Sequence, residues 1–288
     1  MDYFIDSVQA STRMLGRFLP SIGDNGQGVR EQQVLQQILN TVRLFYASAP
    51  EQLQIIGEPA MDDQDMLVPY EWWVRSGSTD TWIGFTVQCC RYLVYRNQPE
   101  KETGRPLITR ERVLQTIRIS RERGTLPIIS FFQPPDEQRR VEDHITDRYW
   151  TFIPAAELLL YMDTEKIDTL QGTHRLGAVT MFDLVCPFFP ETWDLPVTEM
   201  LYRAYTIFMG KESEPAIVPA YDLIPEQQIQ RELPEDIQAA RRAEKSKCTA
   251  LLWISEVQEY PLYRIDNRIS TILREDYHQR LQMKKKGL

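Results

Sequence analysis

Residues 109–132 read TRERVLQTIRISRERGTLPIISFF, and this stretch predicts a helix followed directly by a strand. Thr109 is a good N-cap residue, although no glutamate stands where a capping box would place one. The helix is expected over residues 110–123 and to end at Gly124, because glycine readily adopts the left-handed conformation of a helix C-terminus. Residues 126–132 are apolar enough for a short strand.

Helical spacing of apolar residues recurs on both sides of this stretch. Further helices are predicted over residues 29–48, 154–162, 196–209, 235–259 and 265–282. Residues 82–95 alternate as a half-buried strand would, yet a buried helix fits them equally well. The predicted fold is therefore mainly α with a minor β component (α+β), with amphipathic helices around one large core.

Composition predicts a division of the chain near residues 211–234. This segment is rich in proline and in acidic residues, which favours an extended strap over packed structure. The expected units are a main helical domain with short β elements over residues 1–210, the proline-rich acidic strap, and a C-terminal helical hairpin over residues 235–288.

The bulk composition is that of a soluble globular protein. The chain has 288 residues, of which 42% are hydrophobic and 26% charged, so it can bury a large core. The longest stretch without a charge, residues 124–135, is too short to span a membrane. The N-terminus matches neither a secretory signal nor a transit peptide. We therefore expect a cytoplasmic protein with no membrane partner.

Histidine and cysteine usage argues against several kinds of catalytic site. The three histidines are far apart in sequence, and the four cysteines show no metal-ligand spacing. Cys89 and Cys90 are adjacent, and Cys186 and Cys248 stand alone in apolar surroundings, as buried thiols in a reducing compartment do. The sequence therefore predicts no catalytic residue, no metal site and no cofactor.

An arginine-rich segment over residues 101–140 raises the alternative of RNA or DNA binding, because guanidinium groups bind phosphates. On an ideal helix Arg110, Arg118 and Arg121 share one side, while the other helical arginines lie on another side. The net charge of −8 argues against general polyanion binding. The candidate nucleic-acid-binding residues are Arg105, Arg110, Arg112, Arg118, Arg121, Arg123, Arg139 and Arg140.

The sequence Met61-Asp62-Asp63-Gln64-Asp65 is the densest carboxylate cluster, and we call it the acidic segment. Three close carboxylates could hold a divalent cation, but the glycine and the distant glutamate of an EF-hand loop are absent, which favours a solvated acidic turn. Such charges and the nearby tryptophans also suit protein contacts. The candidate interface residues are Asp62, Asp63, Asp65, Trp72, Trp73 and Tyr221.

These observations favour a non-enzymatic structural or assembly subunit that acts through protein–protein surfaces. Its partners would be further copies of the chain or other proteins, in a homo- or hetero-oligomer. The combination of aromatic residues, arginine and proline suggests a viral capsid or nucleocapsid component, although no motif carries this. Besides nucleic-acid binding, the other alternative is a histidine-independent enzyme that acts on a phosphorylated substrate.

Overall fold

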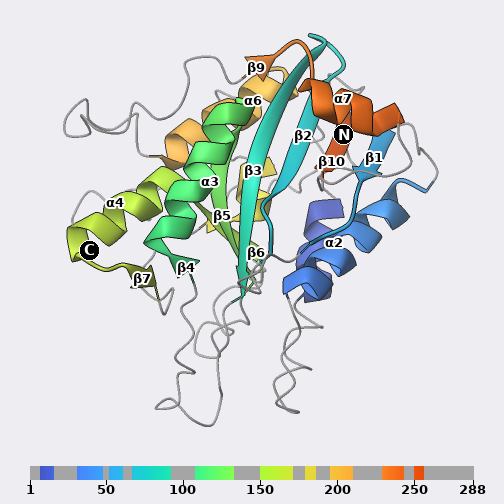
Figure 1. Cartoon of the computed structure of the whole chain (residues 1–288). Coiled ribbons are helices and arrows are strands. Elements are labelled where there is room, and N and C mark those ends of the chain that lie inside the picture. Colours follow the sequence, from blue (N-terminus) through green and yellow to red (C-terminus); the bar gives the residue numbers. More distant parts are fainter. Residues whose placement is uncertain are drawn as a thin grey trace, which may run out of the picture.

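A mixed eight-stranded sheet with helices on both faces forms the centre of the computed structural model (Figure 1). The structure describes residues 7–15, 31–47, 52–60, 67–91, 108–132, 150–170, 179–185, 195–209, 229–242 and 250–255. The strand order is β1-β10-β2-β3-β5-β6-β8, and β9 pairs with the start of β3.

The strands of this sheet are β1 (Leu53–Ile56), β2 (Tyr70–Ser76), β3 (Thr81–Arg91), β5 (Leu126–Phe132), β6 (Trp150–Pro154), β8 (Val179–Thr180), β9 (Ile229–Gln230) and β10 (Ala250–Ser255). A separate two-stranded sheet pairs β4 (Ile108–Thr109) with β7 (Thr169–Leu170). The helices are α2 (Glu31–Phe45), α3 (Arg110–Arg123), α4 (Ala155–Glu165), α5 (Met181–Val185), α6 (Val197–Phe208) and α7 (Glu235–Arg242), and residues 7–15 are also helical.

The two faces of the sheet carry separate apolar clusters because side chains alternate along each strand. On one face, Trp72 of β2 and Phe85 of β3 pack with α2, α5 and α6. On the other face, Ile129 and Phe131 of β5 pack with α3 and α4. Trp73 lies on that second face with residues of α7. The result is a three-layer arrangement of helices, sheet and helices (Figure 1).

Several predicted elements are confirmed. Helix α3 has the predicted bounds, with the Thr109 side chain accepting a bond from the Arg112 amide and with Gly124 at a φ of 63°. Helices α2, α4 and α6 lie within two or three residues of their predicted bounds, and the strand over residues 126–132 is β5. The ambiguous stretch at residues 82–95 is a strand as far as it is described, because Thr81–Arg91 form β3.

The predicted fold class is wrong. About half of the described residues are helical and about a third are in strands, so the fold is an α/β mixture with a large sheet. Strands β2 and β6 were not predicted, because both are buried almost along their whole length. A strand covered on both faces shows a continuous apolar run instead of alternation, and such a run does not distinguish strand from helix.

The C-terminal helical hairpin is also wrong where the structure describes it. Helix α7 ends at Arg242, and residues 250–255 form β10 between β1 and β2. Residues 256–288, with the second predicted helix, lie outside the described residues, as do residues 211–228 of the strap. Within the described residues, no helix combines the length and apolar character needed to cross a bilayer.

Candidate functional site

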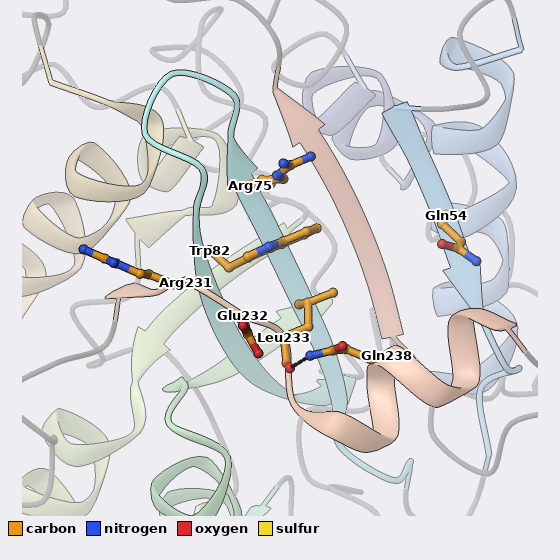
Figure 2. A pocket seen from close by; sticks show the side chains of 7 residues that line it. All are labelled: Gln54, Arg75, Trp82, Arg231, Glu232, Leu233 and Gln238. Atoms are coloured by element: carbon orange, nitrogen blue, oxygen red, sulfur yellow. Dashed lines mark hydrogen bonds between the residues drawn. The ribbon is translucent and has the colours of Figure 1, made fainter.

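An open pocket of about 620 Å³ lies on the face of the sheet that α7 partly covers (Figure 2). Strands β1, β2 and β3 each contribute one side chain, and the residues that connect β9 to α7 contribute the rest with one residue of α7. The lining residues are Gln54, Arg75, Trp82, Arg231, Glu232, Leu233 and Gln238.

The β2–β3 hairpin places Arg75 beside Trp82. The two residues are paired neighbours on adjacent strands, so their side chains lie on the same face. The Arg75 guanidinium lies 5.9 Å from the centroid of the Trp82 ring, within the range of a cation–π contact. Asp80, in the turn between the strands, accepts bonds from Nε (2.9 Å) and Nη2 of Arg75. Among the described residues, Nη1 of Arg75 has no hydrogen-bond partner.

The pocket has an apolar floor and a charged rim. Trp82 and Leu233 are each 5% exposed and belong to the cluster beneath α7. Arg231 and Glu232 are exposed, and neither forms an ion pair with another described residue. Gln238 donates from Nε2 to the carbonyl of Leu233 at 2.7 Å, which fixes the chain where α7 begins. In Figure 2, Arg75 lies above the Trp82 ring, and the side chain of Arg231 points away from that ring.

A cluster of charges next to the pocket, which we call the Arg123 junction, joins α3, β2 and α7. Arg123 donates from Nε to Glu71 Oε1 at 2.6 Å, from Nη2 to Glu71 Oε2 at 3.2 Å and from Nη1 to Asp236 Oδ1 at 2.7 Å. Trp73 donates from Nε1 to Glu71 Oε2 at 2.7 Å. Burial opposes the charge of Arg123, but the bonds to both carboxylates outweigh it and raise the pKa of Arg123. The junction is therefore structural and holds α7 beside the pocket.

Those predicted nucleic-acid-binding arginines that the structure describes are not gathered on one surface. Arg110 pairs with Asp163 of α4 at 2.7 Å, Arg112 is only 8% exposed, and Arg123 belongs to the junction. Only Arg118 and Arg121 are exposed among the candidates that the structure describes. Arg105, Arg139 and Arg140 lie outside the described residues.

Two of the predicted interface residues lie inside the chain. Trp72 and Trp73 are 1% and 0% exposed, and the Trp72 ring lies 5.3 Å from the ring of Phe85. Their apolar area supports the two faces of the sheet, so neither ring offers a contact surface. The remaining candidates, Asp62, Asp63, Asp65 and Tyr221, lie outside the described residues.

The described cysteines are free and buried. Burial raises the pKa of the Cys89 and Cys90 thiols, so both stay protonated and are poor nucleophiles at neutral pH. Cys186 and Cys248 lie outside the described residues. Within the described part of the chain, no group of three or more histidine, cysteine, aspartate or glutamate residues is placed to hold a metal ion.

The pocket was not predicted from the sequence. Arg75 and Trp82 are close in sequence, but Arg231 reaches them only because β9 pairs with β3, about 150 residues earlier in the chain. Pairing between such distant segments leaves no local pattern.

Comparison with known proteins found no match among protein-family models, curated proteins or solved structures. The chemistry of the pocket is therefore the basis for a functional proposal. The pocket combines an apolar floor with guanidinium, carboxylate and amide groups at its rim, which is the usual composition of a protein-binding surface.

Proposed function

We propose that the chain is a non-enzymatic assembly subunit that acts through a protein–protein contact at the open pocket. The observation that carries this proposal is the composition of the pocket. Trp82 and Leu233 form an apolar centre, and Arg75, Arg231 and Glu232 form a polar rim. Protein interfaces have this arrangement, and tryptophan and arginine contribute a large share of their binding energy.

The charges at the pocket favour a polypeptide ligand over nucleic acid. Two guanidinium groups share the site with the carboxylates of Glu232 and Asp80. A phosphate backbone repeats a single charge and would meet both carboxylates at close range. A polypeptide can offer carboxylates to the arginines and main-chain groups to the amides of Gln54 and Gln238.

Nucleic-acid binding keeps less support. Arg118 and Arg121 share the exposed surface of α3 with Glu111 and Glu122, so the helix presents a mixed charge. The capsid or nucleocapsid role and the histidine-independent enzyme stay predictions from composition.

Sedimentation velocity of the purified chain, over about two decades of micromolar concentration, tests the proposal. Arg231→Glu reverses an exposed charge that has no ion-pair partner among the described residues, so the fold should tolerate it. Arg118→Glu makes the same change on the exposed surface of α3 and serves as the matched control. We expect wild type and the control to associate, and Arg231→Glu to weaken association about tenfold.

A second measurement covers partners other than the chain itself. Immobilised wild type, Arg231→Glu and Arg118→Glu are exposed to an extract of the native source, with and without nuclease. A protein that the wild type and Arg118→Glu retain and Arg231→Glu loses, with or without nuclease, supports the proposal. Two results would overturn the proposal. In the first, the chain stays monomeric and retains no protein that is lost by Arg231→Glu. In the second, nuclease treatment abolishes the binding of the retained material and Arg118→Glu weakens that binding.

A further inference from the structure

We propose that the pocket binds the Arg231 side chain of a second copy of the chain, so that two copies form a two-fold symmetric dimer in which each binds Arg231 of the other. This inference rests on the proposed function and names the partner. It depends on the net charge of the pocket, on the direction of the Arg231 side chain and on the backbone that carries it.

Apart from Arg231, the charged groups at the pocket have a net negative charge. Asp80 accepts two bonds from Arg75, so the charges of these two side chains balance each other. Glu232 is exposed and forms no ion pair with another described residue. The neighbouring Arg123 junction adds two carboxylates and only one guanidinium. The pocket is therefore suited to a cationic ligand.

Among cationic groups, a guanidinium matches the pocket in shape and in hydrogen bonding. It can donate two parallel bonds to the carboxylate of Glu232, which an ammonium cannot do. Gln238 uses Nε2 for its bond to the carbonyl of Leu233, so its Oε1 remains an acceptor. The methylene stem of an arginine can lie along the apolar floor of Trp82 and Leu233.

Arg231 does not serve as the cation of its own pocket. Its side chain starts at the rim and points away from the Trp82 ring (Figure 2). The residue is exposed and forms no ion pair with another described residue. Its guanidinium is therefore available to the pocket of a second molecule.

The backbone of residues 231 and 232 is held on both sides. Gln230, which precedes them, pairs with β3 and donates from Nε2 to the carbonyl of Gly124 at 2.7 Å. Leu233, which follows them, is 5% exposed and packs in the cluster beneath α7. A backbone that is already ordered loses little further entropy when its side chains bind.

The neighbouring positions of the two charges make the contact reciprocal. When Arg231 of one copy bonds to Glu232 of the other, the two-fold axis that relates the copies brings the second Arg231 to the first Glu232. Both ion pairs lie close to the axis, because the two residues are consecutive in the chain. Such a contact uses the same surface on both copies, so we expect a dimer and no larger species.

The test uses single and paired charge reversals in the full-length chain. Arg231→Glu and Glu232→Arg each place like charges opposite one another at both ion pairs of a homodimer. The double variant with both changes restores opposite charges. Arg121→Glu and Glu122→Arg make the same changes at two exposed, consecutive residues of α3 and serve as matched controls. Circular dichroism and the thermal midpoint establish that each variant is folded.

Sedimentation velocity measures the dimerisation of each variant. Arg231→Glu and Glu232→Arg should each dimerise at least about tenfold more weakly than wild type, whereas both controls should dimerise as wild type does. The double variant should return to within about threefold of the wild-type affinity. An equal mixture of Arg231→Glu and Glu232→Arg should form a 1:1 dimer at concentrations where each alone is monomeric, because both ion pairs of the mixed dimer join opposite charges.

Three outcomes would rule out this dimer. If Arg231→Glu weakens association but neither the double variant nor the mixture restores it, the reciprocal ion pairs are excluded and the proposed function stays in place. If both single variants dimerise like wild type, the copies associate through another surface. If the wild-type chain is monomeric throughout, the second copy is not the partner, while a different protein retained by wild type and lost by Arg231→Glu would still support the proposed function.

Discussion

Gly84 of β3 lies against the indole of Trp73, which is fully buried. A Cβ atom at this position would lie 2.7 Å from two ring atoms of Trp73 and 2.7 Å from the methyl group of Thr125. Because neither neighbour has free space to move into, we expect Gly84→Ala to lower the free energy of unfolding by about 1–3 kcal/mol. Urea denaturation measures this, and Arg118→Ala on the exposed side of α3 should change it by less than about 0.5 kcal/mol. Equal midpoints for wild type and Gly84→Ala would show that the packing here is loose.

The Arg123 junction contains two carboxylates that should respond differently to substitution. The Glu71 side chain is 11% exposed, and that of Asp236 is 55% exposed. Arg123→Met leaves the charge of Glu71 buried without a cation, and we expect a loss of about 3 kcal/mol or more. Asp236→Asn removes only an exposed partner and should cost less than about 1 kcal/mol.

Equilibrium unfolding in urea measures both changes, and the double variant Glu71→Gln with Arg123→Met serves as control. It removes the buried charge together with its cation, so it should be more stable than Arg123→Met alone. Equal losses for Arg123→Met and Asp236→Asn would mean that Glu71 is not the buried partner.

The pH dependence of stability should report on Asp236. Burial favours its neutral form, but the bond and the charge of Arg123, with the amides of the first turn of α7, outweigh burial and lower its pKa. A lowered pKa in the folded state stabilises the fold above about pH 4, and this contribution is lost as the pH falls further. Wild type should therefore exceed Asp236→Asn in stability at pH 7, and the difference should shrink as the pH falls below about 4. A difference that does not change between these pH values would contradict the ion pair.

At the scale of the elements, the most consequential feature is the insertion of β10 between β1 and β2. Residues 250–255 pair antiparallel with β1 and parallel with β2. Proline cannot donate a ladder bond and is not tolerated in a central strand. We expect Leu252→Pro to lower stability by about 3 kcal/mol or more. Leu252→Ala separates the loss of the side chain from the loss of the backbone bond, and a proline variant no less stable than this alanine variant would place the strand elsewhere.

The elements that could be predicted from sequence are those whose stability is local. Helix α3 was predicted to the residue because Thr109 and Gly124 mark its ends. Helix α6 was predicted to within one residue at each end because Pro196 precedes an amphipathic pattern. Strand β10 was not predicted, because its local sequence is compatible with both a helix and a strand, and only the segments that it packs against decide between them. Residues 250–255 lie within a continuous helical pattern and become a strand by pairing with residues about 180 to 200 positions earlier. The pocket depends on the same kind of pairing, so it was equally hidden.

On the scale of the whole molecule, residues 229–242 and 250–255 belong to the same layers as the rest of the described chain. β9 pairs with β3, β10 lies between β1 and β2, and Ile237 of α7 packs on Trp73 and Trp82. The region after the acidic strap therefore covers one face of the central strands and fills the gap between two of them. Removing it would expose the edge of β2 and the indoles beneath α7, which together form a large apolar surface.

This arrangement predicts that the described chain unfolds as one unit, not as separate regions before and after residues 211–234. If α7 and β10 opened independently, β2 would lose its pairing with β10, and Trp73 would lose its contact with α7. Such an opening should therefore require nearly the full free energy of unfolding. Hydrogen exchange at increasing urea measures this directly. Peptides from α7 and β10 should lose protection at the same urea concentration as peptides from β2. Loss at clearly lower urea would instead identify residues 235–255 as a separately folding unit, and the pocket would then lie on a boundary that can open.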